Sequence, residues 1–161
     1  MKKAFMFSLS FLLFFASCNQ VDTELPEPFT VSKDGTNFTI ASQDDLIKFV
    51  KIAEKAKDIT VKKVALEDFD HEIYNKVIRG QYLTKEKETV SFMIFMKEND
   101  VLSKANEGYY GVGCTQRCKA NANCCGCDQT VTEPCVSQIC NCKDSCHVPG
   151  TESSCSAETS F

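Results

Sequence analysis

The amino-acid sequence predicts an α+β fold: a small antiparallel sheet with one main helix, followed by an irregular, disulfide-rich cysteine cluster. Alternating apolar and polar residues around Asp34-Gly35 predict the sheet, and a helical repeat that begins at Ser42 predicts the helix. The third observation is that ten of the eleven cysteines lie between Cys114 and Cys155, in a segment without Phe, Tyr, Leu or Met. Such a segment buries too little apolar surface to offset its chain entropy, so we expect covalent bonds to hold it.

A β-hairpin is expected near the start of the folded part. Residues 29–32 and 37–40 alternate apolar and polar around the segment 33–36. The Asp34-Gly35 pair within it is a strong hairpin signal, because both central positions of such a turn require positive φ. The residues expected on one buried face are Phe29, Val31, Phe38 and Ile40.

The main helix is expected from Ser42 to Lys57. Ser42 is a suitable N-cap, with Asp45 three residues later as in a capping box. Acidic residues come early and lysines late, which suits the helix dipole. The apolar residues at helical spacing are Leu46, Phe49, Val50, Ala53 and Ala56. This stripe is typical of a helix that faces a core.

Three more strands are predicted. Residues 59–66 alternate with a slip between Val61 and Val64, which indicates a bulge. The segment 70–80 fits one helical face, yet 77–84 also fits a strand, and the strand is preferred because a polar turn and another apolar run follow. That run, 89–96, is apolar on both faces and predicts a central strand covered on both sides.

The composition divides the chain into a signal peptide (1–17), a lipidated cysteine with an extended tether (18–28), a small α+β domain (29–104) and a cysteine-rich tail (105–161). The leader has two lysines, a short apolar run and small residues before Cys18. The run is shorter than the ~20 residues of a membrane-spanning helix. Three glycines, at 108, 111 and 113, mark a hinge-like boundary before the tail.

The order Phe15-Ala16-Ser17-Cys18 resembles the lipobox of bacterial lipoproteins. The resemblance implies that Cys18 receives a diacylglycerol, that the leader is removed and that the new amino terminus is acylated, for example with palmitate. Several acyl chains on one residue give stable membrane anchoring. Asn19 after the cysteine is similar to lipoproteins sent to an outer membrane, so we expect the bacterial cell envelope as the location. An ordinary secretory signal with a chance cysteine is the alternative.

The charge balance bears on partners. Lys and Arg number 18 against 22 Asp and Glu, which gives a net charge of −4 without any basic run. We therefore expect no nucleic-acid partner, and a membrane contact through the lipid alone. No cofactor is expected, and the protein or ligand partner is not predicted.

Disulfides are the leading interpretation of the tail. Once Cys18 is assigned to lipid, the remaining cysteines form an even set in an exported chain, where disulfides persist. The set expected to pair, with unknown connectivity, is Cys114, Cys118, Cys124, Cys125, Cys127, Cys135, Cys140, Cys142, Cys146 and Cys155. The neighbours Cys124 and Cys125 are expected to have different partners, since bridging adjacent residues strains the backbone.

Metal binding is the alternative for the same cysteines. The Cys-Cys and Cys-x-Cys pairs and the scarcity of aromatic residues resemble metallothioneins, which bind soft ions such as zinc or copper through thiolates. Cys114-x3-Cys118 and Cys142-x3-Cys146 also have zinc-ligand spacing, and His147 could add a nitrogen. The exported location favours disulfides, so no metal site is assigned.

An enzyme is not expected, because the sequence contains no catalytic motif. The two histidines are His71 and His147. The first lies in a polar cluster, read as a solvated turn rather than a cation or acid–base site: Glu67, Asp68, Asp70, His71 and Glu72. Three classes of function remain open: a binding or structural envelope lipoprotein, a metal-binding lipoprotein, and an enzyme with an unrecognised site.

Overall fold

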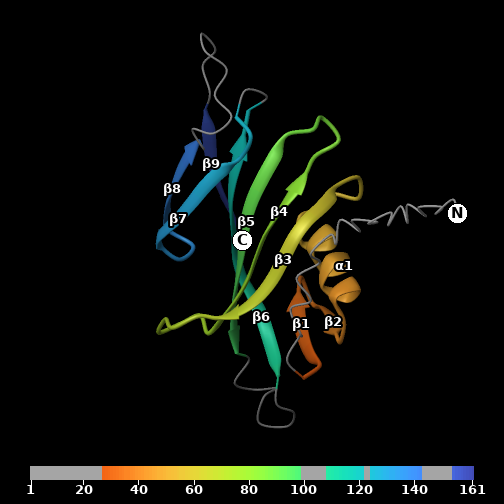
Figure 1. Cartoon of the computed structure of the whole chain (residues 1–161). Coiled ribbons are helices and arrows are strands. Elements are labelled where there is room, and N and C mark those ends of the chain that lie inside the picture. Colours follow the sequence, from red (N-terminus) through yellow and green to blue (C-terminus); the bar gives the residue numbers. More distant parts are fainter. Residues whose placement is uncertain (1–26, 99–107, 122–123, 143–153) are drawn as a thin grey trace, which may run out of the picture.

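The fold is rich in β-structure. The computed structural model describes residues 27–98, 108–121, 124–142 and 154–161 (Figure 1). Strands account for 60% of the described residues and helix for 10%, so the predicted α+β class is wrong. The structure is instead a curled half-barrel sheet with one helix in its described part. The predicted signal peptide, Cys18 and the predicted tether up to residue 26 lie outside the described residues.

Seven strands form the main sheet, in the order β2-β1-β6-β5-β4-β3 with β9 added beside β6. Their bounds are β1 (Phe29–Lys33), β2 (Thr36–Ile40), β3 (Thr60–Asp68), β4 (Lys76–Leu83), β5 (Thr89–Glu98), β6 (Tyr109–Ala120) and β9 (Cys155–Ser160). Two further strands, β7 (Cys127–Glu133) and β8 (Ser137–Cys142), form a separate antiparallel sheet. We call these two the β7–β8 hairpin.

The predicted first hairpin is confirmed. Strands β1 and β2 pair antiparallel, and Lys33 lies opposite Thr36 across the turn. Asp34 and Gly35 have φ angles of 50° and 76°, as this type of turn requires.

The helix, α1 (Gln43–Ala53), begins where the sequence predicts and ends earlier. The Ser42 hydroxyl accepts a hydrogen bond from the Asp45 N–H at 3.2 Å. At the other end Lys55 has a φ of 51° and donates to the Ile52 carbonyl, while Ala56 donates to the Lys51 carbonyl. This pair of bonds is a Schellman cap, and it stops the helix before the predicted Lys57.

The sheet curls until both of its edge strands contact α1. On the β2 side, Phe38 packs edge-on against Phe49 of the helix, with ring centroids 5.6 Å apart. On the β3 side, the Gln43 amide donates to the Val64 carbonyl at 3.1 Å. The predicted bulge is present as a register shift between Val61 and Lys63. The helix therefore covers the inner face of the half-barrel.

Strand β5 is covered on both faces, as predicted. On the inner face Val90, Phe92 and Ile94 belong to the same buried cluster as the apolar stripe of α1. On the other face Phe95 packs in a second cluster with Cys114 and Cys135. The segment 76–83 is a strand, which confirms that interpretation of the ambiguous region.

Strand β6 overturns the prediction of an irregular tail. One edge pairs with β5 over most of its length. The other edge pairs in parallel with β1 near Tyr109 and antiparallel with β9 from Thr115 to Ala120. The tail thus supplies a central strand of the sheet, and the glycines read as a hinge lie at its start. A Cβ on Gly113 would overlap the Tyr74 ring, so this glycine permits close packing.

The β7–β8 hairpin lies on the face of the sheet opposite to α1. Figure 1 shows it on the left, with the sheet between it and the helix. Val131 of β7 packs with Val77 and Phe95 in the second cluster. The hairpin makes few apolar contacts with the sheet. This agrees with the prediction that covalent bonds, rather than apolar burial, hold the cysteine-rich segment.

Candidate functional site: the disulfide-linked hairpin

Two disulfides attach the β7–β8 hairpin to β6. They join Cys114 to Cys135 and Cys118 to Cys140, with Cα separations of 5.6 Å in both. Side chains alternate across a strand, so residues four apart share a face. Cys114 and Cys118 consequently both point from β6 toward the hairpin, and both are fully buried.

Two more disulfides lie at one end of the hairpin. Cys124 is joined to Cys142 and Cys127 to Cys155, with Cα separations of 5.9 and 6.1 Å. Cys125 is also disulfide-bonded, so the two adjacent cysteines have different partners, as predicted. The predicted disulfide state is confirmed for the tail cysteines that the structure describes. Cys146 and His147 lie outside these residues.

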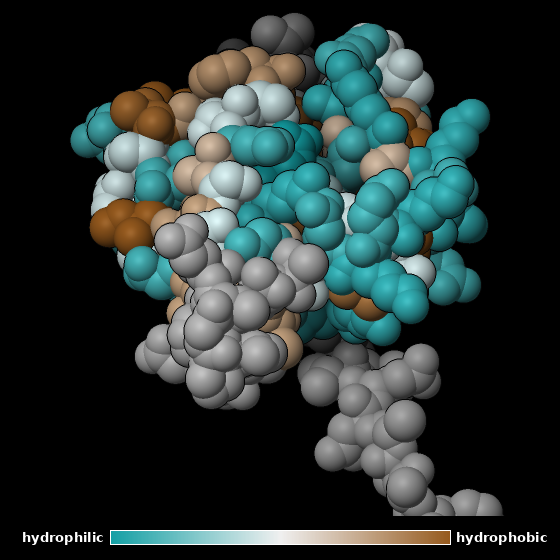
Figure 2. All heavy atoms as spheres, turned by 90° about the horizontal axis from the view of Figure 1, so that it is seen from above, coloured by the Kyte–Doolittle hydropathy of each residue, from teal (hydrophilic) through white to brown (hydrophobic). Residues whose placement is uncertain are grey.

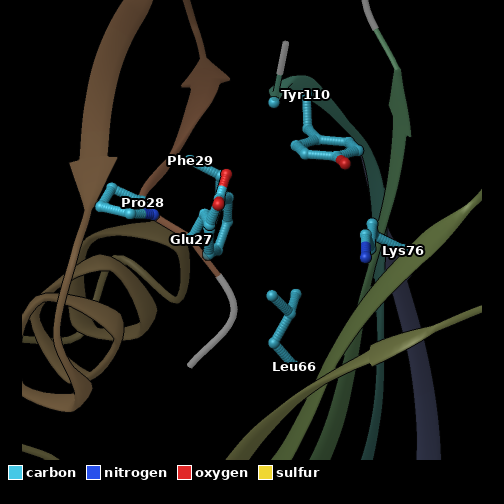
Figure 3. Close-up of a pocket in the computed structure, with 7 residues that line it drawn as sticks. Glu27, Pro28, Phe29, Leu66, Lys76 and Tyr110 are labelled. Carbon is cyan, nitrogen blue, oxygen red and sulfur yellow. The ribbon is translucent and has the colours of Figure 1, made fainter. Parts of the chain in front are cut away.

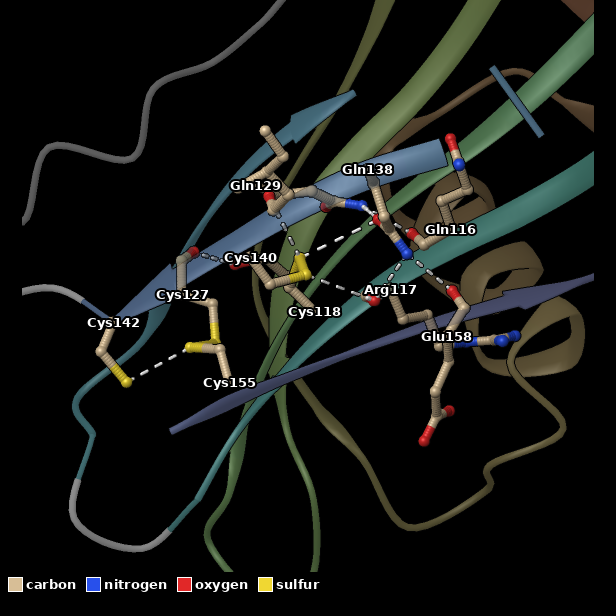
Figure 4. Close-up of a disulfide and its surroundings, with 12 residues drawn as sticks. Gln116, Arg117, Cys118, Cys127, Gln129, Gln138, Cys140, Cys142, Cys155 and Glu158 are labelled. Atoms are coloured by element: carbon tan, nitrogen blue, oxygen red, sulfur yellow. Dashed lines mark hydrogen bonds between the residues drawn. A yellow bond between two sulfur atoms is a disulfide. The ribbon is translucent and has the colours of Figure 1, made fainter. Parts of the chain in front are cut away.

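The second pair of disulfides brings four sulfur atoms together. We call the Sγ atoms of Cys124, Cys127, Cys142 and Cys155 the four-sulfur cluster. The Cys155 Sγ lies 3.7 Å from that of Cys124. It lies 3.4 Å from that of Cys142, a contact drawn in Figure 4. The Sγ atoms of Cys124, Cys127 and Cys155 all lie within 4.8 Å of one another, and within the described ranges they form the one group suited to a metal ion.

The sequence interpretation missed one signal for this cluster. Cys124 and Cys127 stand in Cys-x2-Cys spacing, with Cys125 and Gly126 between them. This spacing is common among zinc ligands and in redox-active proteins. In the structure the two cysteines are not bonded to each other, because each forms a disulfide with a distant strand.

Amide side chains bind the hairpin to the sheet beside the disulfides. The Gln129 amide donates to the Gln116 carbonyl at 3.0 Å and to the Gln138 side-chain oxygen at 2.7 Å. Gln138 in turn donates to the carbonyls of Arg117 and Glu158, at 3.0 and 2.9 Å (Figure 4). These bonds span β6, β7, β8 and β9, so the hairpin is fixed to the sheet by polar contacts as well as covalently.

Gln116 lies between the two cysteines of β6 and is fully buried. Among the described residues, neither polar atom of its side chain has a hydrogen-bond partner. An unpaired buried amide costs about 1–3 kcal/mol.

A buried ion pair lies on the other face of β6. Arg117 donates through Nε to the Glu54 carboxylate at 2.5 Å, and the Tyr82 hydroxyl donates to the same oxygen at 2.8 Å. Burial raises the pKa of Tyr82, and the Glu54 charge raises it further. Burial alone would lower the pKa of Arg117, but the hydrogen bond and charge of Glu54 outweigh it and raise that pKa. Arg117 also donates to the Ser160 hydroxyl, which links α1 to β9.

A cavity of about 280 Å³ opens where β1 and the start of β6 approach β3 and β4 (Figure 3). Its lining residues are Glu27, Pro28, Phe29, Leu66, Lys76, Gly108 and Tyr110. The cation among them, Lys76, is ion-paired with Asp68 of β3. The lining thus combines apolar groups with one acidic residue, Glu27, and one lysine whose charge is partly neutralised by Asp68.

The polar cluster around His71 does not converge on a common centre. Glu67 pairs with Arg79 at 2.9 Å, and Asp68 pairs with Lys76. His71 stacks against Phe69 and Tyr74, with ring centroids 6.0 and 5.6 Å away, and accepts a hydrogen bond from a backbone N–H. These contacts favour the interpretation of a turn between strands over a cation site.

No family model, curated protein or solved structure matches the chain.

Among the residues that the structure describes, no helix has the length and apolar character needed to cross a membrane.

Proposed function

We propose that the protein is a lipid-anchored lipoprotein of the bacterial cell envelope with a non-enzymatic binding or structural function, and that the β7–β8 hairpin contacts its protein partner. The observation that carries this proposal is that the hairpin is fixed on its inner face and exposed on its outer face. Two disulfides and the amide contacts hold the inner side against β6.

The outer side carries two exposed aliphatic residues. Val136 is 67% exposed and Ile139 is 49% exposed. In the view from above, most brown and tan spheres lie on the left, the side of the hairpin, and the right side is mostly teal (Figure 2). Exposed apolar groups on a rigid element favour partner binding, because little conformational entropy is lost when the complex forms.

The turn at the tip of the hairpin is similarly fixed. Cys135 has a φ of 64°, an uncommon value for a residue other than glycine. The same residue is bonded to Cys114 of β6, and Val136 follows it directly. The disulfide therefore holds the exposed Val136 at a set position above the sheet.

The anchor is supported by the sequence alone. Phe15-Ala16-Ser17-Cys18 resembles a lipobox, and the tether that follows joins the anchor to β1. Acylation of Cys18 would attach the folded part to a membrane, and Asn19 favours the outer one.

Labelling with a fatty-acid analogue tests the anchor. We expect wild-type protein to carry the label and to fractionate with membranes, and Cys18→Ser to carry none. Equal labelling of the two proteins would contradict the proposal.

Site-specific photocrosslinking in cells tests the contact surface. A photoreactive residue at position 136 or 139 should give one discrete adduct with the same envelope protein. The matched control is position 52, since Ile52 is 48% exposed but lies on α1, on the opposite side of the sheet. Equal adducts at all three positions, or none at the hairpin, would contradict the hairpin as the contact surface.

A metal-binding lipoprotein is the second candidate. The four-sulfur cluster favours it, because it gathers soft ligands at a partly buried site. In the structure these sulfurs form disulfides, so this candidate requires a reduced state.

A further inference from the structure

We infer that the four-sulfur cluster is a zinc site of the reduced protein, in which the thiolates of Cys124, Cys127, Cys142 and Cys155 bind one Zn²⁺. The inference rests on the second candidate function and specifies its metal and its ligands. It gives these four cysteines a role as metal ligands that the other cysteines of the tail do not have.

Two of the six separations between these sulfurs are already close to those of a tetrahedral site. With Zn–S bonds of about 2.3 Å, neighbouring sulfurs of a tetrahedron are roughly 3.8 Å apart. The Cys155 Sγ lies 3.7 Å from that of Cys124 and 3.4 Å from that of Cys142. The bonded sulfurs would separate from about 2 Å to this distance, so each moves by roughly 1 Å, which a side-chain rotation provides.

The backbone that carries three of the four cysteines, Cys127, Cys142 and Cys155, is held independently of their disulfides. Cys127 and Cys142 are directly opposite each other in the β7–β8 register. Cys155 begins β9, which pairs with β6 over six residues. The Ser91 hydroxyl donates to the Cys127 carbonyl at 2.9 Å, and this bond ties that end of β7 to β5. Opening the two disulfides therefore leaves the sulfurs of these three cysteines close together.

The ligand set favours zinc. Four thiolates in a tetrahedral arrangement are typical of structural zinc sites, and Cys124-x2-Cys127 supplies the short pair that such sites commonly contain. Cys124 and Cys127 are 6% and 1% exposed, so two of the ligands lie in a shielded position. Cys114 and Cys118 are buried further along β6, and each is bonded to a cysteine outside the cluster.

The chemistry of loading balances with a dithiol reductant. Each disulfide accepts two electrons and two protons from one dithiol, which becomes a disulfide, so two dithiols release four thiols. When Zn²⁺ binds, the four thiols release four protons to the solvent and the zinc–sulfur bonds form.

Zinc analysis of the reduced full chain tests the inference. The protein is reduced under anaerobic conditions with a water-soluble phosphine, which becomes a phosphine oxide with water as the oxygen source. It is then supplied with Zn²⁺ and desalted. We expect one zinc per chain in the reduced protein and none in the oxidised one. Replacing Zn²⁺ with Co²⁺ should give the visible absorption of a tetrahedral thiolate site.

Two double variants form a matched pair. Cys124→Ser/Cys142→Ser and Cys114→Ser/Cys135→Ser each remove one disulfide and two thiols, but only the first removes metal ligands. We expect the first to bind zinc about a hundredfold more weakly, or worse, and the second to bind like wild type. The single variant Cys155→Ser, which removes one ligand, should also lose the cobalt spectrum. It gives a second readout if the first double variant does not fold.

The outcomes separate the inference from the function on which it rests. Several zinc ions per chain, or equal loss of zinc in both double variants, would overturn the four-sulfur site but leave a metal-binding protein. A reduced wild-type chain that binds no zinc would overturn both. Equal zinc on the oxidised and reduced proteins would place the ion outside the cluster and overturn the inference.

Discussion

Arg117, in the second half of β6, donates a hydrogen bond to the buried carboxylate of Glu54, the residue that caps the end of α1. The side chain of Glu54 is fully buried and that of Arg117 is 15% exposed. The two residues are 63 positions apart in the chain, and their contact joins the helix to the strand that also carries the hairpin disulfides. The ion pair and the disulfides thus lie on opposite faces of one strand.

Removal of one member of this pair should be costly. Arg117→Met leaves the Glu54 charge buried without its partner, so we expect a loss of about 3–5 kcal/mol in the free energy of unfolding. The control is Arg79→Met, because Arg79 pairs with Glu67 at the surface and both side chains are more than 40% exposed. This variant should lose at most about 1 kcal/mol. Urea unfolding with disulfides intact measures both, and equal losses would contradict the importance of the buried pair.

The apolar face of α1 should dominate its contribution to stability. Phe49 is 1% exposed, and Phe49→Ala should cost about 3–5 kcal/mol because it leaves a cavity under the sheet. Ile52→Ala, on the exposed side of the same helix, should change stability by less than about 0.5 kcal/mol. A loss below about 1 kcal/mol for Phe49→Ala in thermal or urea unfolding would mean that this face is not in the core.

Two glycines of β6 should respond differently to the same substitution. A Cβ on Gly113 would overlap the Tyr74 ring, which is packed against Phe95, whereas a Cβ on Gly111 would meet nothing within 4 Å. We expect Gly113→Ala to lose about 1–3 kcal/mol and Gly111→Ala to be neutral or slightly stabilising. Chemical denaturation compares the two, and a neutral Gly113→Ala would show that the Tyr74 ring is free to move aside.

Stability should fall at alkaline pH in a way that depends on Tyr82. Burial and the Glu54 charge raise the pKa of Tyr82 in the folded protein. Above pH ~10 the unfolded chain loses the tyrosine proton while the folded chain keeps it, so the unfolded state binds fewer protons and stability falls as pH rises. Tyr82→Phe should therefore lose less stability than wild type between pH ~9 and 11. Parallel pH profiles of the two proteins would contradict this assignment.

The disulfide set should be complete in the native protein. Four bridges are placed, and Cys125 is also disulfide-bonded, so we predict Cys146 as its partner. Mass spectrometry of the native chain should show a mass about two daltons lower per bridge than after reduction. Proteolytic peptides should include one that links Cys125 to Cys146. A peptide that links Cys125 to any other cysteine would contradict the prediction.

Local patterns account for the elements that the sequence predicts correctly. The Asp34-Gly35 turn, the Ser42 cap and the apolar strand 89–96 are each specified by neighbouring residues, and all three are present. The early end of α1 is harder to predict from the sequence, because the residue with positive φ that ends the helix is Lys55 and not a glycine.

The tail could not be predicted in the same way. The residues of β6 that face the hairpin are cysteines and a glutamine rather than large apolar residues, so the usual alternation is missing. Cys114-x3-Cys118, read as zinc-ligand spacing, also places two cysteines on one face of a strand. The four-sulfur cluster depends on β9 reaching β6, a pairing between distant segments that short-range patterns do not encode.

The position of β6 bears on how the oxidised chain is assembled. Strands β1 to β5 contain no cysteine, and β6 contributes just Cys114 and Cys118. Pairing of β5 with β6 can therefore be complete while every thiol of the tail is still reduced. Strand β6 then presents the Cys114 and Cys118 thiols on one face, four residues apart, and the cysteines of the hairpin must match this spacing. The eight cysteines of the four placed bridges alone admit 105 pairings. If the sheet forms first, it acts as a template for oxidation. The backbone hydrogen bonds of the sheet then select the disulfide connectivity, and repeated thiol–disulfide exchange is not needed.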